Sequence, residues 1–114
     1  MKQLDDLHLT QSQHQALAEL KQRLLDDFDV ENLVLYGSVA RGEADGESDI
    51  DLLVLTSDSL SRSERHRITD TVFEVNLEHG TNFSTLVVTQ ASWESGAVSV
   101  LPLREEIARE GVPL

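Results

Sequence analysis

The residues of this chain that suit chemistry gather in one stretch, where Gly37-Ser38 precedes Asp49 and Asp51 by ten intervening residues. Residues two apart in a strand project from the same face, so a strand that begins near Asp49 presents both carboxylates together. Two neighbouring carboxylates repel each other unless a positive charge lies between them. Magnesium favours one or two carboxylates with water and substrate phosphates. The spacing therefore predicts a Mg²⁺ site at Asp49 and Asp51.

The Gly37-Ser38 pair lies where a phosphate group would bind. The apolar run Asn32–Tyr36 predicts a strand that stops at Gly37, and one or two helical turns are expected from Ser38 to about Glu43. The N-terminus of a helix presents unpaired N–H groups and a partial positive charge, which together bind phosphate. Gly37 lets a phosphate approach the backbone, and the Ser38 hydroxyl can donate a further hydrogen bond. If the two strands are neighbours, a triphosphate would bridge the serine turn and the metal.

Simpler explanations exist for each half of this pattern. Asp49 and Asp51 alone would also suit two acids at the edge of a loop, and Ser38 would serve as a plain helix cap. The Gly-Ser pair at its fixed distance favours the functional interpretation. A Walker A loop is excluded because Glu43-Ala44 stands where lysine and a hydroxyl residue are required. An EF-hand is excluded because Ile50 stands where that loop needs glycine.

Helices and strands are expected to alternate along the chain. Thr10 is predicted to cap a helix that runs to about Phe28, and Ser61 with Glu64 predicts a capping box for a long helix that stops near Gly80. The other expected elements are strands over residues 49–55 and 83–89, a short helix over 91–94, and a last helix from Pro102 to before Gly111. This order predicts an α/β or α+β fold, with a short mixed sheet flanked by helices.

Apolar spacing indicates which sides of these elements are buried. The predicted buried positions are Leu17, Leu20, Leu24 and Phe28 in the first helix, Ile68, Val72, Val75 and Leu77 in the second, and both faces of the strand at Leu52–Leu55. Trp93 is expected to pack the last helix onto the sheet. The apolar end of the tail over residues 109–114 is expected to dock on the sheet edge or on a partner. The four histidines are interpreted as surface or helix-end residues and not as ligands.

Length, charge and composition limit the classes of protein. The 114 residues fit one domain over residues 1–114, and the absence of cysteine excludes disulfides and thiolate ligands. A net charge of −12 repels polyphosphate backbones, so general nucleic-acid binding is not expected. The same acidity would attract a basic protein partner, or simply keep the domain soluble. No signal peptide and no run of about 18 apolar residues is present, so a cytoplasmic protein without a membrane span is expected.

The central stretch resembles the signature of the DNA polymerase β-like nucleotidyltransferase superfamily, which is a Gly-Ser pair, ten residues and then Asp-x-Asp, here Gly37 to Asp51. Arg41-Gly42 and Ser48 are also similar to the residues that family members usually carry in between. The short chain resembles the minimal nucleotidyltransferases (MNT), many of which pair with a HEPN-domain protein as antitoxins of toxin–antitoxin modules. The resemblance implies the nucleotidyltransferase fold and transfer of a nucleoside monophosphate from a nucleoside triphosphate to a hydroxyl.

The resemblance also implies a role for each matching residue. Gly37 and Ser38 would hold the β- and γ-phosphates of ATP. Asp49 and Asp51 would be the catalytic residues and would ligate Mg²⁺. Arg41 would steady a phosphate.

One feature of active family members is missing. They usually carry a third carboxylate on the neighbouring strand, but the strand expected over residues 83–89 has no Asp or Glu. Ser84 or Thr85 would take that place, and a neutral hydroxyl is no general base near neutral pH. Glu74 and Glu78 on the preceding helix would either reach the site or remain solvated on the helix face.

Two main hypotheses about function result. The first is an enzyme that binds Mg-ATP and transfers AMP to a hydroxyl on a HEPN-domain partner, acting as the antitoxin of a HEPN/MNT module. The second is a weakly active or inactive nucleotidyltransferase-like domain that neutralises its partner by binding alone. The missing carboxylate favours the second hypothesis. A third is a sensor that binds ATP without turnover.

Overall fold

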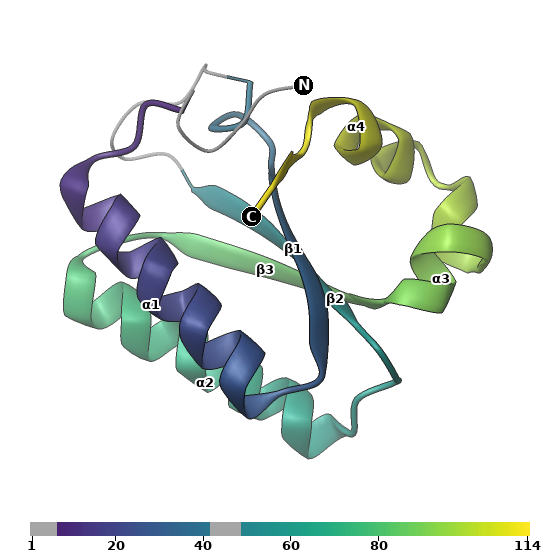
Figure 1. The fold of residues 1–114 in the computed structure, drawn as a ribbon, viewed down its shortest axis with the longest axis horizontal. Coiled ribbons are helices and arrows are strands. Elements are labelled where there is room, and N and C mark those ends of the chain that lie inside the picture. The colour runs from purple at the N-terminus through teal and green to yellow at the C-terminus, as the bar shows by residue number, and fades with distance from the viewer. Residues whose placement is uncertain (1–6, 42–48) are drawn as a thin grey trace.

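The computed structural model describes residues 7–41 and 49–114 of the chain. Its elements are α1 (Gln11–Asp27), β1 (Val30–Tyr36), β2 (Ile50–Thr56), α2 (Arg62–His79), β3 (Phe83–Thr89), α3 (Gln90–Ser95), η2 (Ala97–Val100), α4 (Pro102–Glu110) and β4 (Val112–Pro113) (Figure 1). The predicted mixture and order of helices and strands are confirmed, except that no helix occurs between β1 and β2 in the described part of the chain. The short 3₁₀ helix η2 and the two-residue strand β4 were not predicted. None of the described helices has both the length and the apolarity needed to cross a membrane.

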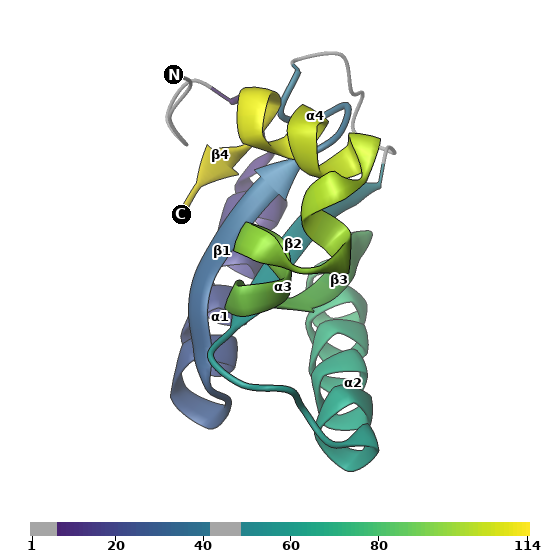
Figure 2. The same cartoon turned by 90° about the vertical axis from the view of Figure 1, so that its right-hand side faces the viewer.

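The four strands form one mixed sheet in the order β3-β2-β1-β4. β1 pairs antiparallel with β2 and with β4, while β2 and β3 run parallel. Helices α1 and α2 cover one face of the sheet, and α3 and α4 lie against the other (Figure 2). This arrangement is the predicted mixed sheet flanked by helices.

The larger core lies between the sheet and the helix pair α1 and α2. The predicted positions Leu17, Leu20, Leu24, Phe28, Ile68, Val72 and Val75 are all buried in it. Burial of Leu52–Leu55 is also confirmed, because these strand residues are almost inaccessible from either face. The prediction for Leu77 was wrong, since this side chain is 74% exposed. Two residues past Val75 the helix has turned about 200°, which places Leu77 on the outer side of α2.

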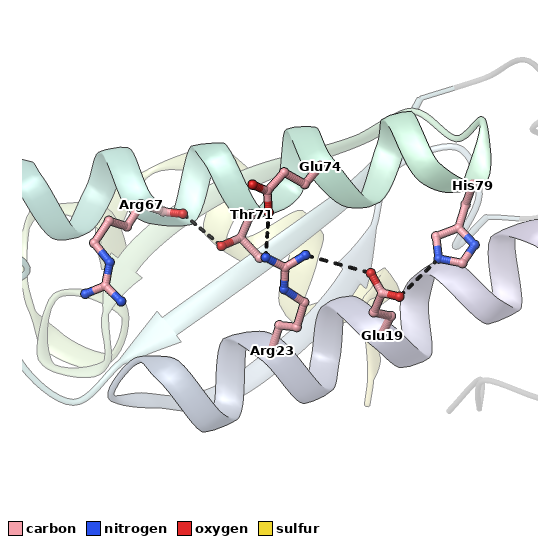
Figure 3. A network of polar contacts seen from close by, with 6 residues as sticks. All are labelled: Glu19, Arg23, Arg67, Thr71, Glu74 and His79. Atoms are coloured by element: carbon pink, nitrogen blue, oxygen red, sulfur yellow. Dashed lines mark hydrogen bonds and ion pairs between the residues drawn. The ribbon is translucent and has the colours of Figure 1, made fainter.

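Polar contacts join the two helices along their exposed border (Figure 3). Arg23 Nη2 of α1 lies 2.6 Å from Glu74 Oε2 of α2, and its Nη1 lies 3.8 Å from Glu19 Oε2 one turn away. His79, the last residue of α2, has its Nε2 atom 3.4 Å from Glu19 Oε1. These pairs are partly solvated, so they orient the helices more than they stabilise them.

A smaller core fills the space between the sheet and the second pair of helices. Trp93 of α3 and Ile107 of α4 are buried there against Leu53, Leu55 and Val88 of the sheet. The expectation that Trp93 packs the last helix onto the sheet is confirmed. The tail docks on the sheet edge, the first of its two predicted positions, because Val112 pairs with Leu35 and is fully buried.

Local sequence signals set the ends of the two long helices. Thr10 and Ser61 both form capping boxes, in which the hydroxyl accepts from the N–H group three residues on. Gly80 ends α2 in the left-handed conformation, with φ 67° and ψ 38°. All three signals had been predicted, and together they fix where the chain leaves α2 toward β3.

Asn76 of α2 holds the beginning of β3. Its Oδ1 atom accepts a 2.8 Å hydrogen bond from the Phe83 N–H group, and its Nδ2 group donates to the Phe83 carbonyl at 3.0 Å. The Thr81 hydroxyl donates to the same Oδ1 atom at 3.0 Å. One amide side chain therefore substitutes for a neighbouring strand at Phe83 and positions β3 relative to α2.

We predict that Asn76→Ala lowers the free energy of unfolding by about 2 kcal/mol, because it leaves the two backbone groups of Phe83 and the Thr81 hydroxyl without their partner. Urea denaturation followed by circular dichroism would measure the change. Asp70→Ala, an exposed change on the same helix, should cost less than about 0.5 kcal/mol. Equal losses in the two variants would contradict this role of Asn76.

Candidate active site

The register of β1 and β2 brings the two halves of the motif together. Tyr36, the last residue of β1, pairs with Asp51 near the beginning of β2. The Asp51 side chain projects from the same face as Leu53 and Leu55, which is the face that α3 and α4 cover further along. Asp49 lies just before the strand and is exposed, while Asp51 is partly buried. The predicted adjacency of the two strands is therefore present.

Gly37 lies directly against the Asp51 carboxylate. Its φ of 82° is in the left-handed region, and a Cβ atom added there would overlap with Asp51 Oδ2. The chain then makes a single turn, closed by the Arg41 N–H group, which donates to the Gly37 carbonyl at 3.1 Å. Ser38 lies in this turn, immediately after the residue that contacts Asp51.

This turn corresponds to the first of the one or two helical turns that were predicted, since the bond from Arg41 to Gly37 has helical spacing. The remainder of that prediction lies outside the described residues. The same is true of Gly42, of the loop over residues 44–48 and of Ser48 within the motif.

Burial and neighbouring charges both act on the Asp51 carboxyl. Burial raises the pKa of the Asp51 carboxyl above its ordinary value, the nearby charge of Asp49 raises it further, and Arg41 opposes both. Burial and the charge of Asp51 also raise the pKa of the Tyr36 hydroxyl. A cation placed between the two aspartates would relieve this repulsion, so the donor set fits a divalent metal.

A pocket of about 110 Å³ opens beside the Gly37 turn. It is lined by Tyr36, Gly37, Arg41, Leu103, Glu106, Ile107 and Glu110. Arg41 was predicted to steady a phosphate, and its Nη1 atom lies 3.3 Å from Glu110 Oε2. Neither Tyr36 nor the α4 residues had been predicted as part of the site. The one sequence feature that could have indicated α4 is the acidic pair Glu106 and Glu110, which lie one helical turn apart.

The strand β3, which lies beside β2, carries no acid on the Asp51 side of the sheet. Ser84 of β3 lies in register with Asp51, and the next residues of β3 with the same orientation are Leu86 and Val88. Glu74 does not supply the third carboxylate, because it pairs with Arg23 on the opposite face.

Glu78 also lies away from the aspartates. It gathers with Glu19 and His79 at the border of α1 and α2, where their ligand atoms lie within 4.8 Å of one another. Glu74 and Glu78 were expected either to reach the site or to remain solvated on the helix face. The structure shows the second arrangement, because both side chains are exposed on α2. Of Ser84 and Thr85, the two residues expected in place of a third carboxylate, Ser84 is the one in register with Asp51.

Sequence comparison identifies the class of protein to which this fold and site belong. The profile of the nucleotidyltransferase domain family matches residues 17–113, which include the whole motif and most of both cores. The chain belongs to this family. The Putative protein adenylyltransferase MJ1305 of Methanocaldococcus jannaschii is 34% identical over 87 residues, which make up 75% of this chain and 58% of that protein. The chain thus spans little more than half the length of this relative.

Solved structures share the fold. A structure described as a putative minimal nucleotidyltransferase is 26% identical, with a TM-score of 0.56, over 89% of this chain and 90% of that chain. A further match is a structure of a tri-AMPylated Shewanella oneidensis HEPN toxin in complex with MNT antitoxin. It is 16% identical, with a TM-score of 0.56, over 88% of this chain and 69% of that chain.

We predict that Gly37→Ala destabilises the chain by at least about 2 kcal/mol, because the methyl group adds an overlap with Asp51 to the cost of the positive φ. Gly80→Ala is the matched control: its φ is 67°, but nothing lies within 4 Å of the added Cβ atom. That variant should lose only about 1 kcal/mol. Chemical denaturation would compare the two, and equal losses would contradict the close packing of Gly37 on Asp51.

We predict that Asp51→Asn stabilises the metal-free chain at pH 7. Because folding raises the pKa of Asp51, its carboxyl group favours the folded state at low pH, and this contribution is lost as the pH rises through the folded pKa. Asparagine has no charge to bury. The gain in the denaturation midpoint should therefore be largest at neutral pH and shrink below about pH 4.

Denaturation in EDTA across this pH range would measure the gain. The exposed change Asp58→Asn is the control and should show no comparable gain at pH 7. A gain from Asp51→Asn that grows as the pH falls would contradict the direction of the shift.

Proposed function

We propose that this chain binds Mg-ATP and transfers AMP to a hydroxyl on a partner protein, as the antitoxin of a HEPN/MNT toxin–antitoxin module. The observation that carries the proposal is the close approach of Gly37 to Asp51, which brings the turn proposed to hold phosphate beside a carboxylate proposed to hold the metal. The names of the relatives support it: one is called a protein adenylyltransferase, and another is an MNT antitoxin in complex with an AMPylated HEPN toxin.

Each residue of the motif has a proposed part in this reaction. Gly37 and Ser38 hold the β- and γ-phosphates, because the N–H groups of the turn and the hydroxyl donate toward them. Asp49 and Asp51 hold Mg²⁺, which neutralises the triphosphate when bound. Arg41, now paired with Glu110, exchanges that partner for a phosphate.

The proposed transfer is a displacement at the α-phosphorus of ATP. The acceptor oxygen forms a bond to this phosphorus, and the bond from phosphorus to the pyrophosphate oxygen breaks. Pyrophosphate leaves, and the hydroxyl proton passes to solvent. ATP is favoured over other nucleotides by the names of the relatives alone, since no described side chain is assigned to the base.

A second function is favoured by one specific observation. Ser84, the β3 residue in register with Asp51, is neutral, and β3 as a whole has no Asp or Glu to act as a third carboxylate. A chain with two acids is a weaker catalyst than one with three, so it would neutralise a basic partner by docking alone. The net charge of −12 supports such docking.

One experiment distinguishes the two functions. The chain is incubated with α-labelled ATP, magnesium and a HEPN-domain protein. We predict that label appears on the partner and that Asp49→Asn/Asp51→Asn lowers the rate at least about a hundredfold, because the Mg²⁺ ligands are lost. Chelation with EDTA should have the same effect.

Complex formation by the double variant is the control, measured by size-exclusion chromatography. If the double variant binds the partner but no longer neutralises it, docking alone is excluded. If neutralisation persists in full without label on the partner, the transferase proposal is wrong and the docking function takes its place.

A further inference from the structure

The outer edge of β3 has no strand beside it. β3 is the last strand of the sheet order, and no strand in the described part of the chain pairs with its far side. Its seven residues, Phe83–Thr89, include no charge and no proline. Proteins normally protect such an edge with charged residues, proline or a covering segment, because an open ladder recruits another strand. β3 is therefore suited to receive a strand.

The backbone orientation shows which groups of β3 are open. The Asn82 carbonyl accepts from the Ile50 N–H group of β2, so alternate residues from Asn82 onward point toward β2. Phe83, Thr85 and Val87 then point outward. Asn76 covers Phe83, whereas no hydrogen bond in the described chain engages the outward backbone groups of Thr85 and Val87.

A groove of about 330 Å³ runs along this edge between β3 and α2. Its lining comprises Thr69, Val72, Phe73 and Asn76 of α2 with Phe83, Ser84 and Thr85 of β3. Two large apolar side chains, Phe73 and Leu77, stand on the outer side of α2 one turn apart and are 65% and 74% exposed. The edge thus combines open backbone groups with apolar surface, which are the two components of strand addition.

The chemistry of the edge identifies the occupant as an extended polypeptide, since alternating N–H and C=O groups are matched by another strand. Charge disfavours a second copy of this chain, because each copy carries −12, and favours a segment of a basic protein. The β3 edge also lies near the candidate site, because Ser84 of β3 is in register with Asp51 of β2 and projects from the same face of the sheet.

A strand added outside β3 would run roughly 10 Å from the backbone of β2, two strand spacings away. The small Ser84 side chain lies between them on the Asp51 face. A long side chain from the added strand, such as tyrosine, can extend over Ser84 toward the aspartates. The edge is therefore placed to present an acceptor hydroxyl to the proposed site.

We propose that the β3 edge with the Phe73–Leu77 ridge binds an extended, basic segment of the acceptor protein and presents its hydroxyl to Asp49 and Asp51. This inference rests on the proposed function and adds the docking mode. The open backbone groups of Thr85 and Val87 give the segment its register, and the groove holds its side chains on the α2 side.

Two pairs of variants test the docking mode against the HEPN-domain protein used above. Thr85→Pro removes an outward N–H group and no bond to β2, and Thr85→Ala is its control. Phe73→Glu places a charge on the ridge, and Val100→Glu, at an 82% exposed position of η2, is its control. We predict about a tenfold or greater loss of affinity for the proline and Phe73 variants by calorimetry, and less than about twofold for both controls.

Hydrogen exchange of the free chain and of the complex gives an independent readout. The amides of Thr85 and Val87 should exchange rapidly in the free chain and become protected in the complex. Those of Ser84, Leu86 and Val88 already bond to β2 and should change little. Circular dichroism confirms that each variant is folded.

The outcomes separate this inference from the proposed function. Labelling of the partner that is unaffected by Thr85→Pro and Phe73→Glu overturns the docking mode and leaves the transferase intact. Binding that depends on both residues without any label supports the docking mode and rejects the transferase. A free chain that dimerises through this edge, and becomes monomeric on Thr85→Pro, assigns the edge to a second copy and overturns the proposal.

Discussion

The close approach of Gly37 to Asp51 is the constraint on which the site depends. A carboxylate on β2 and a turn after β1 share one space only if residue 37 has no side chain and adopts a positive φ. The pairing of Tyr36 with Asp51 sets that meeting point. A slip of β2 by one residue would turn Asp51 into the α1 and α2 core and bring Ile50 to the site. The buried pairs between the two strands, such as Leu35 with Leu52, keep this register.

The same arrangement places the negative charge of Asp51 in a partly buried position, which destabilises the folded state. Asp51 is held partly buried and close to Asp49, which is why its pKa is raised. Strand β2 tolerates the unfavourable charge of Asp51 because the residues that follow, Leu52–Leu55, are buried on both faces of the sheet. Their burial anchors β2 in the centre of the sheet. The burial of the strand thus compensates for repulsion at its first residues. A site that is electrostatically unfavourable when empty gains most from a bound cation.

Much of this architecture could be predicted because its causes are local. Caps at Thr10 and Ser61, the stop at Gly80 and the position of Asp51 near the beginning of a strand all follow from patterns within a few residues. Leu77 was placed wrongly because apolarity alone does not decide burial at the margin of a helical face. The strand β4 and the contribution of Glu106 and Glu110 to the pocket depend on contacts with β1 and the Gly37 turn about 70 residues earlier. Such contacts leave no local pattern.

Two properties of β3 have one origin in its composition. Phe83–Thr89 has no ionisable residue, so the strand offers neither a third carboxylate beside Asp51 nor the charges that usually protect an edge. A member that carried an acid at position 84 would gain a ligand on the site face. It would also place a negative charge where the side chain of an added strand must pass. In this chain Ser84 is neutral. Under the two proposals above, the residue that would weaken catalysis by the isolated chain is therefore the one that would leave room for a partner. A site of this kind would be completed by association, and its activity would depend on the complex.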